Sequence, residues 1–538
     1  MGRTKQGTTT RKQDASRSTA PPRHVPAPAV TYAIGSPAAA RRVTSALLAS
    51  FHTRHDGRSL ADRVYLDTFD SRLYREGGML TADAADGAWV LTWYDLAGRR
   101  RHRSVQGGRP DFGRDLSEGR FRDELVRVVG IRRLLPVVRV EQSSERLSLL
   151  DHREKVVARL RLEGGTAVDE SGKRRRVPAR LRVERLIGYE RAHAMLRHFL
   201  ARKVGLARDD RDTLSVALAA LGRTPVSYTA RLDLRLDARQ RADRATKCVL
   251  ARLFEVMEAN EDGLRRNLDA EFLHDFRVAV RRTRSCLGQL EGVLDAAVAR
   301  HFADEFAWLG SETGPSRDLD IYLLSLDAYR AELPETAREH LAPLADYLQQ
   351  KQDVARRRLT RGLESDRYLR LKRDWSVVVT ADADEPGPHA ARPIRALAAE
   401  RIRRAYGRVR KRGRKLSDIT PAETIHRLRI DCKKLRYLLE FFRSLFDDER
   451  VGTIIQGMKR LQDDLGDYND LQVQQRELSG MADDMLRQGT AGAPTVLAMG
   501  RLVDRLESRE QALRRRLATA VRGFVSESRA DEVGECVR

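Results

Sequence analysis

Two short stretches of the chain carry the side chains best suited to binding chemistry. Residues 274–284 read HDFRVAVRRTR and residues 426–436 read HRLRIDCKKLR. In each stretch a histidine is followed by basic residues three, seven and ten positions later, and at about 100° per residue these four positions lie within about 80° of one another on a helix. Apolar residues occupy the opposite side. Both stretches therefore predict an amphipathic helix with a cationic front, made of His274, Arg277, Arg281 and Arg284 in the first and His426, Arg429, Lys433 and Arg436 in the second.

The chemistry of these fronts suits phosphate. The planar guanidinium of arginine can bind two phosphate oxygens at once, whereas lysine acts as a point charge. A charged helix face is usually only solvated, but no acidic residue occupies the front positions and the spacing occurs twice, which favours a binding site for a polyanion. For the two histidines, local packing as a neutral ring and contact with phosphate as a cation both remain open.

Carboxylates near the stretches have two interpretations each. Glu271 and Glu423 precede the histidines by three residues, a spacing that di-metal helical bundles use, but a first-turn acid that favours the helix dipole explains them more simply. Asp318 and Asp470 could be mistaken for a catalytic pair; we expect them to cap a helix after a glycine-containing loop, or to pair with an arginine of the front. The sequence therefore predicts no catalytic residue, no metal and no cofactor.

A third basic segment lies between the two stretches. Residues 401–415 read RIRRAYGRVRKRGRK, with nine basic residues and no acid. It adds Arg404, Arg408 and Lys411 as weaker candidates for polyanion contact.

Composition limits the partners. The 538 residues include 101 Lys and Arg against 77 Asp and Glu, a net charge of +24 that favours a polyanionic partner. No run approaches the ~18 apolar residues of a membrane span, and no secretory signal opens the chain, so we expect a cytoplasmic protein that does not bind membranes. The four cysteines have neither metal-ligand nor disulfide spacing. Oligomeric state leaves no signal in the sequence.

The chain divides by pattern into an α+β part and an all-α part. Residues 1–40 resemble a disordered basic tail, and residues 41–235 contain short strand-like runs such as VYLDTF, PVVRVE and RLSLLD, typical of an antiparallel sheet. Residues 240–525 show helical periodicity only, and residues 526–538 form a tail. The helical part is duplicated, because His274 and His426, Gly314 and Gly466, and Asp318 and Asp470 are all 152 positions apart. The repeats are expected at about 240–378 and 392–525.

The helical part resembles the CHAD family. The motifs that carry the resemblance are HDFRVAVRRTRSCLGQL followed by SRDLD, and HRLRIDCKKLRYLLEFF followed by LQDDLGDYNDLQV. The resemblance implies a bundle of two helical repeats that binds inorganic polyphosphate and associates with polyphosphate granules. It also implies contact positions, which are His274, Arg277, Arg281, Arg282, Arg284, His426, Arg429, Lys433, Lys434 and Arg436.

The α+β part is similar to the CYTH family, whose members form a β-barrel tunnel for triphosphate and metal. The segments RVYLDTFDSRLYREGGML and GAWVLTWYDL carry this resemblance. The alternating Glu-x-Glu-x-Lys strand that opens the family's enzymes is absent, Met79 to Asp83 stand where the family has arginines, and Trp93 stands where it has lysine. A triphosphatase needs metal held by clustered carboxylates, so we expect a degenerate, inactive CYTH-like domain.

Three functions compete. Polyphosphate binding without catalysis is the leading one. Nucleic-acid binding suits the same charge, but aromatic residues are only 6% and Tyr406 and Tyr437 alone stand among the basic residues, so bases have few platforms on which to stack. A metal-dependent triphosphate hydrolase in the CYTH-like part is the third.

Overall fold

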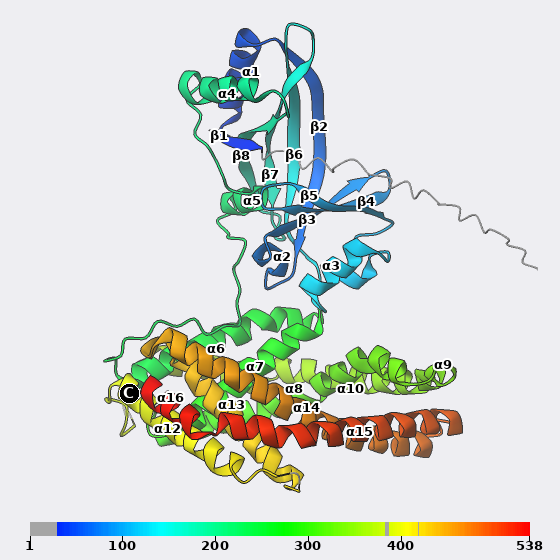
Figure 1. Cartoon of the computed structure of the whole chain (residues 1–538), viewed down its shortest axis with the longest axis vertical. Helices are drawn as coiled ribbons and strands as arrows, with labels where there is room; N and C mark the ends of the chain where they lie inside the picture. Colours follow the sequence, from blue (N-terminus) through cyan, green and yellow to red (C-terminus); the bar gives the residue numbers. More distant parts are fainter. Residues whose placement is uncertain (1–28, 382–386, 418) are drawn as a thin grey trace, which may run out of the picture. The chain divides into compact units, whose positions relative to one another are not determined.

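The computed structural model describes residues 29–381, 387–417 and 419–538. They form two compact units (Figure 1): one contains the described residues up to Gly130 together with Leu134–Ser227, and the other contains Ile131–Arg133 and Tyr228–Arg538. The second unit thus begins before residue 240 and takes in three residues from the middle of the first. None of the described helices combines the length and apolar composition needed to cross a membrane.

The first unit is an antiparallel β-sheet with a few helices, as the strand-like runs predict. Eight strands are hydrogen-bonded in the order β1-β8-β7-β6-β2-β3-β4-β5. The strands are β1 (Val30–Gly35), β2 (Thr53–Asp67), β3 (Gly78–Ala85), β4 (Ala88–Asp95), β5 (Arg100–Gln106), β6 (Leu135–Leu150), β7 (Val156–Val168) and β8 (Arg174–Arg185). The helices are α1 (Pro37–Ser50), α2 (Arg72–Arg75), α3 (Arg120–Val129), α4 (Glu190–His198) and α5 (Thr213–Ala220), with single turns at Gly113–Asp115 and Phe199–Lys203.

Two details of this sheet differ from the sequence prediction. PVVRVE and all but the last residue of RLSLLD are parts of the one strand β6. This strand pairs with β2 from Leu135 to Leu149, including the polar residues between the two runs. The boundary expected at residue 40 falls earlier, since β1 pairs with β8 and α1 starts at Pro37. Residues 1–28, which make up most of the predicted tail, lie outside the described residues.

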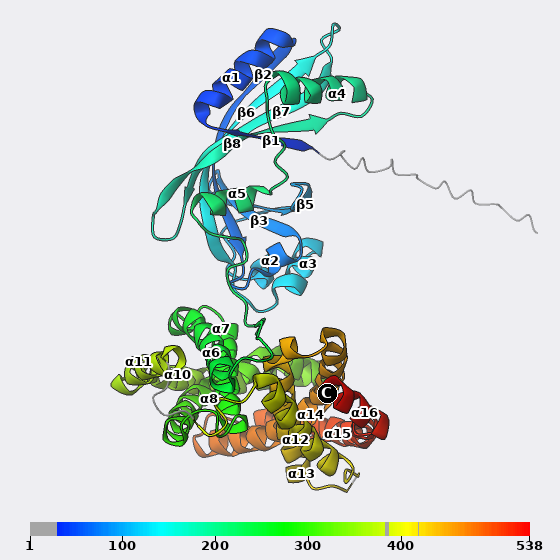
Figure 2. The ribbon, with the colours of Figure 1, turned by 90° about the vertical axis from the view of Figure 1, so that its left-hand side faces the viewer.

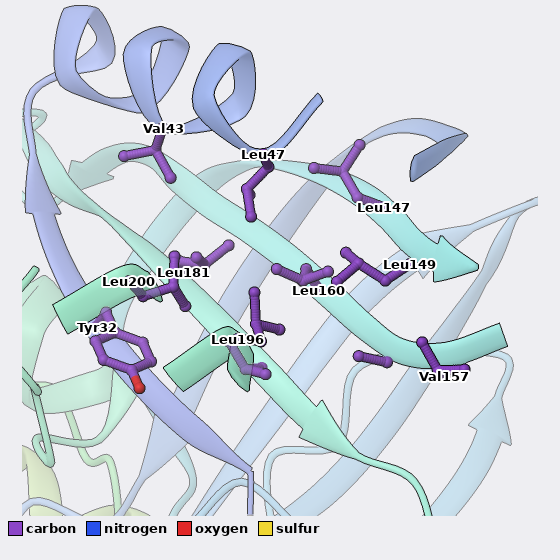
Figure 3. Packing of buried hydrophobic residues seen from close by; sticks show 12 residues of the cluster. Tyr32, Val43, Leu47, Leu147, Leu149, Val157, Leu160, Leu181, Leu196 and Leu200 are labelled. Atoms are coloured by element: carbon purple, nitrogen blue, oxygen red, sulfur yellow. The ribbon is translucent and has the colours of Figure 1, made fainter. Parts of the chain in front are cut away.

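One hydrophobic core of this unit forms where α1 and α4 cover one face of the sheet. Val43 and Leu47 of α1 pack against Leu147, Leu160 and Leu181 of three neighbouring strands, as Figure 3 shows. All five side chains are buried. Burial of this apolar surface fixes α1 on the sheet, because the hydrophobic effect scales with the area removed from water.

The second unit is helical, as predicted (Figure 2). Its helices are α6 (Ala242–Arg265), α7 (Ala270–Gln289), α8 (Ala296–Glu332), α9 (Glu335–Arg338), α10 (Ala342–Glu364), α11 (Asp366–Thr380), α12 (Ile394–Gly413), α13 (Ala422–Phe441), α14 (Asp448–Arg487), α15 (Ala493–Phe524) and α16 (Glu527–Cys536). The two basic stretches lie on α7 and α13. Their apolar sides are buried, with Phe276, Val280 and Leu287 in α7 and Leu428, Leu435 and Leu439 in α13.

Helix boundaries repeat at the same interval as the motifs. Each of α12, α13 and α14 begins 152 residues after its counterpart: Ile394 after Ala242, Ala422 after Ala270, and Asp448 after Ala296. The helices α10 and α15 correspond in the same way to within one residue. Two copies of one helical unit therefore make up the bundle.

The prediction that Asp318 and Asp470 cap helices is wrong. Both lie in the middle of long helices, Asp318 in α8 and Asp470 in α14. The glycines that suggested a loop are helical as well, and α8 runs on through Pro315. Packing of these helices in the bundle outweighs the cost of glycine and proline in a helix interior.

Candidate polyanion-binding site

The front of α7 opens onto a hollow of about 340 Å³. Arg277, Arg281 and Arg284 line one side of it, and residues of α8 from Ala307 to Thr313 line the other. The guanidinium groups lie close to the glycines of α8: a Cβ at Gly314 would lie 3.5 Å from Nη1 of Arg277, and one at Gly310 would lie 3.6 Å from Nη1 of Arg284, both ordinary contact distances. Arg277 also donates hydrogen bonds from Nη1 to the Gly310 carbonyl and the Thr313 hydroxyl, both at 2.9 Å.

The front of α13 is built from the counterpart residues. Nη2 of Arg429 lies 3.5 Å from a carboxylate oxygen of Asp470 on α14. Arg436 forms an ion pair of 3.4 Å with Glu440. Lys433, between the two arginines, is half-buried and within electrostatic reach of both.

Contacts between α7 and α13 bring the two fronts together. Arg282 of α7 pairs with Glu440 of α13 at 2.7 Å, and Gln289 of α7 donates a 3.0 Å hydrogen bond to the Lys434 carbonyl. Lys434 is the counterpart of Arg282, and Glu440 is the counterpart of Gly288, the neighbour of Gln289. The position of Arg282 and Lys434 on one helix thus contacts the region of Gln289 and Glu440 on the other helix, in both directions. Such reciprocal contacts are expected when the two repeats are related by an approximate twofold axis.

Arg281 and Lys433 lie close to this pseudo-twofold axis. They are counterparts of each other, and Arg281 is near enough to affect both Lys433 and Arg429 electrostatically. The described cations at this centre, Arg277, Arg281, Arg429 and Lys433, are called the central cluster below. Within the described parts of the chain, Arg281 and Lys433 form no ion pair with a carboxylate.

Repulsion between cations of the central cluster contributes to lowered pKa values in it. Burial, followed by repulsion from Arg429 and Arg281, lowers the pKa of Lys433 to about 8. Burial also lowers the pKa of Arg277 and of Arg429, against the opposing effect of Asp318 and Asp470. An anion bound here would relieve the repulsion, so the fold holds the cations ready for one.

Polyanion binding should therefore weaken as the pH rises through about 8. Below this pH the free protein already carries the Lys433 charge, whereas above it the lysine must take up a proton in order to bind. We expect affinity for polyphosphate to fall up to about tenfold between pH 7 and pH 9 in titrations at constant ionic strength. The variant Lys433→Arg keeps its charge and should show a flat profile; the same decline in that variant would contradict this assignment.

The two histidines have different surroundings. His274 is half-buried, and its Nδ1 accepts a hydrogen bond from Arg317 at 3.2 Å, so it is neutral. Burial and then Arg317 lower the pKa of His274 to about 4. His426 is exposed, and its Nδ1 lies 2.6 Å from the side-chain oxygen of Asn469, to which it donates. His426 is thus the more exposed of the two histidines at the fronts.

Several predicted contact residues lie away from the central cluster. The Arg282 side chain is 15% exposed and is held by Glu440. Lys434 lies about 100° around α13 from Lys433 and about 140° from Arg429. On α12, Arg404 pairs with Glu400, and Arg408 lies 3.8 Å from Asp431 on the far side of α13. Lys411 shares the helix face of these two arginines. The structure does not bring Arg404, Arg408 or Lys411 to the fronts of α7 and α13.

Comparison with known families identifies this unit. Residues 248–479 match the family model described as the CHAD domain. The chain contains a CHAD domain. Two curated relatives, the uncharacterized proteins MT2285 and Rv2226 from two strains of Mycobacterium tuberculosis, are each 27% identical over 262 residues, which is 46% of this chain and 48% of theirs. The chain thus spans about half the length of the curated relatives it matches.

Solved structures give matches of the same extent. A CHAD domain from the plant Ricinus communis matches with a TM-score of 0.45 and 26% identity, over 55% of this chain and 96% of that one. PptA from Streptomyces chartreusis matches with a TM-score of 0.40 and 16% identity, over 52% of this chain and 99% of that one.

The CHAD domain also uses residues that the sequence did not single out. Arg317 of α8 donates a hydrogen bond to His274. Asp470 pairs with Arg429, which is one of the two roles that the sequence allowed for this carboxylate. Arg317 directly precedes Asp318, and Asn469 directly precedes Asp470. Because both residues hold the same place in their repeats, this position could have indicated them from the sequence. Arg132 contacts α7 from far away in the sequence, and no local pattern indicates it.

The two glutamates of the Glu-x-x-His spacing lie at the starts of their helices. Glu271 and Glu423 lie in the first turns of α7 and α13, where acids favour the helix dipole, and Glu423 pairs with Arg427. Across the residues that the structure describes, no three side chains of the types His, Cys, Asp and Glu are grouped closely enough to hold a metal ion.

Proposed function

We propose that the CHAD domain binds inorganic polyphosphate across the fronts of α7 and α13. The observation that carries the proposal is the central cluster, where Arg281 of one repeat lies close enough to Arg429 and Lys433 of the other to act on their charges. A linear polyanion that crosses both helices can contact cations of both repeats at once, and each contact releases a counterion. Such a surface gains avidity on a long polymer, which supports association with polyphosphate granules in the cell.

The aromatic residues favour polyphosphate over nucleic acid. Tyr437 is 4% exposed and is flanked by the guanidinium groups of Arg282 and Arg436, and Tyr406 is 5% exposed. Neither ring offers a face on which a base could stack. Recognition of single-stranded nucleic acid usually relies on such platforms, whereas polyphosphate presents phosphate alone.

For the β-sheet unit we propose a degenerate CYTH-like domain without hydrolytic activity. Met79 to Asp83 of β3 and Trp93 of β4 stand where the family would carry phosphate-binding cations. Met79, Leu80, Ala82 and Trp93 are buried apolar side chains, Thr81 is buried, and Asp83 is paired with Arg63. None of these side chains offers a cation to a triphosphate, which supports the proposal. Eight antiparallel strands support the likeness in architecture.

A competition experiment on the full chain tests this function. We expect long-chain polyphosphate to displace labelled polyphosphate at a phosphate concentration at least about tenfold lower than RNA does, at physiological salt. Equal competition by RNA would instead make the domain a general binder of phosphate backbones. Phosphate release with magnesium in the same sample would reassign the function to hydrolysis.

A further inference from the structure

A buried arginine from outside the CHAD family match holds the start of α7. Arg132 is 1% exposed, and its guanidinium lies 3.2 Å from Asp269 and 2.7 Å from Asp275. The side chain also lies over the ring of Phe272, at 5.1 Å. Arg132 belongs to the segment Ile131–Arg133, which packs with the helical unit although it precedes α6 by more than a hundred residues.

The carboxylates of Asp269 and Asp275 both accept hydrogen bonds near the start of α7. Asp269 is the N-cap residue and accepts hydrogen bonds from the backbone N–H groups of Glu271 and Phe272, and its side chain is 1% exposed. Its second oxygen accepts from the backbone N–H of Arg133. Asp275 also accepts from the Tyr228 hydroxyl, which Asn260 contacts at 2.7 Å. A network of buried polar groups thus surrounds the first turn of the basic helix.

The second repeat lacks this arrangement. The counterpart of Asp269 is Pro421, whose side chain cannot cap α13, and the counterpart of Asp275 is the exposed Arg427. The anchor therefore serves the first repeat alone and is not part of the duplicated unit.

We propose that Arg132 is a positioning residue for polyanion binding: it fixes the first turns of α7 and thereby places His274 and Arg277 at the front. This inference rests on the proposed function. Without Arg132, the buried carboxylate of Asp269 and the half-buried carboxylate of Asp275 would both lose their cation, a costly state that opening of the helix start would relieve by exposure to water. His274 and Arg277 lie within the two turns that would open, and Arg317 would lose its acceptor on His274.

The full chain with Arg132→Met tests the proposal, with Arg127→Met as a control of equal charge change on the exposed side of α3. We expect affinity for polyphosphate to fall about tenfold and its salt dependence to flatten by the equivalent of about one phosphate in the first variant only. Hydrogen exchange should speed up in α7 and stay unchanged in α13.

A triple variant, Arg132→Met with Asp269→Asn and Asp275→Asn, leaves no unpaired charge and keeps a capping side chain, so it should restore both affinity and slow exchange.

Three outcomes would overturn the proposal. Unchanged affinity despite faster exchange in α7 would give Arg132 a purely structural role. An equal loss of affinity in Arg127→Met would make the effect one of net charge. A triple variant that exchanges slowly in α7 but binds as poorly as Arg132→Met would show that helix position is not the cause. If the unaltered protein failed to bind polyphosphate, the proposed function would fall, and the exchange in α7 would still report whether Arg132 anchors that helix.

Discussion

Replacing the four residues of the central cluster by glutamate is expected to abolish polyphosphate binding. Arg277, Arg281, Arg429 and Lys433 come from both repeats. Their reversal removes four cations that we propose contact phosphate and adds repulsion, so we expect a loss of about a thousandfold or more in titrations at moderate salt. The slope of log affinity against log salt should fall by roughly 0.7 to 0.9 for each phosphate that is no longer neutralised. Each pair alone should give a partial loss.

Folding of this variant is expected to survive. The four side chains lie off the buried apolar faces of α7 and α13, and their mutual repulsion already disfavours the unliganded state. The helical circular dichroism should therefore be kept, and a matching set of four glutamines, which adds no negative charge, distinguishes removal of the cations from any cost of charge reversal. In cells that make polyphosphate, the unaltered protein should form foci on granules and the glutamate variant should be diffuse.

A matched charge reversal elsewhere serves as the control. Arg100, Arg103, Arg153 and Arg175 are exposed residues of the β-sheet unit, and changing all four to glutamate alters the net charge by the same amount. If this control weakened binding as much as the central variant, attraction would be a diffuse effect of the +24 charge and α7 and α13 would not form a site.

Neutralising Asp318 and Asp470 is expected to have the opposite effect. Asp470 faces Arg429 at 3.5 Å, and Asp318 is close enough to Arg277 to stabilise its charge. A polyanion must compete with these carboxylates for the arginines and is repelled by them. We expect the double variant Asp318→Asn/Asp470→Asn to bind polyphosphate about tenfold more tightly, as measured by the same titrations.

The variant Asp327→Asn/Asp483→Asn controls for net charge. These exposed aspartates lie on the same two helices, about 13 and 20 Å further along them, and should change affinity by less than about twofold at physiological salt. A gain of similar size in this control, or a loss of affinity in the Asp318 and Asp470 variant, would show that the two carboxylates do not compete with the ligand.

The sequence predicted most of what local pattern encodes. The spacing of Arg277, Arg281 and their counterparts defined both the helices and the cationic fronts, since helical periodicity alone decides which residues share a face. The constant interval of 152 residues predicted the duplicated helices, whose boundaries follow it.

Local sequence pattern could not predict which distant residue each side chain contacts in the folded protein. The stretch around Gly314 and Pro315 looked like a loop, yet tertiary packing keeps it helical. Arg282 belongs to the same basic run as Arg281, but sequence spacing gives no sign of its pairing with Glu440 from the other repeat. Arg132 is bound by carboxylates that lie well over a hundred residues away, a distance over which sequence spacing carries no information.

The reciprocal contacts of α7 and α13 have a consequence for the direction of a bound polymer. Because Arg281 and Lys433 are counterparts beside the pseudo-twofold axis, a chain that crosses from one repeat to the other meets a similar order of charges whichever end enters first. Inorganic polyphosphate reads the same from both ends, whereas a strand of nucleic acid has distinct 5′ and 3′ directions. The approximate symmetry of the site and the lack of polarity of polyphosphate therefore match, whereas a nucleic-acid strand would meet the site in two chemically different orientations.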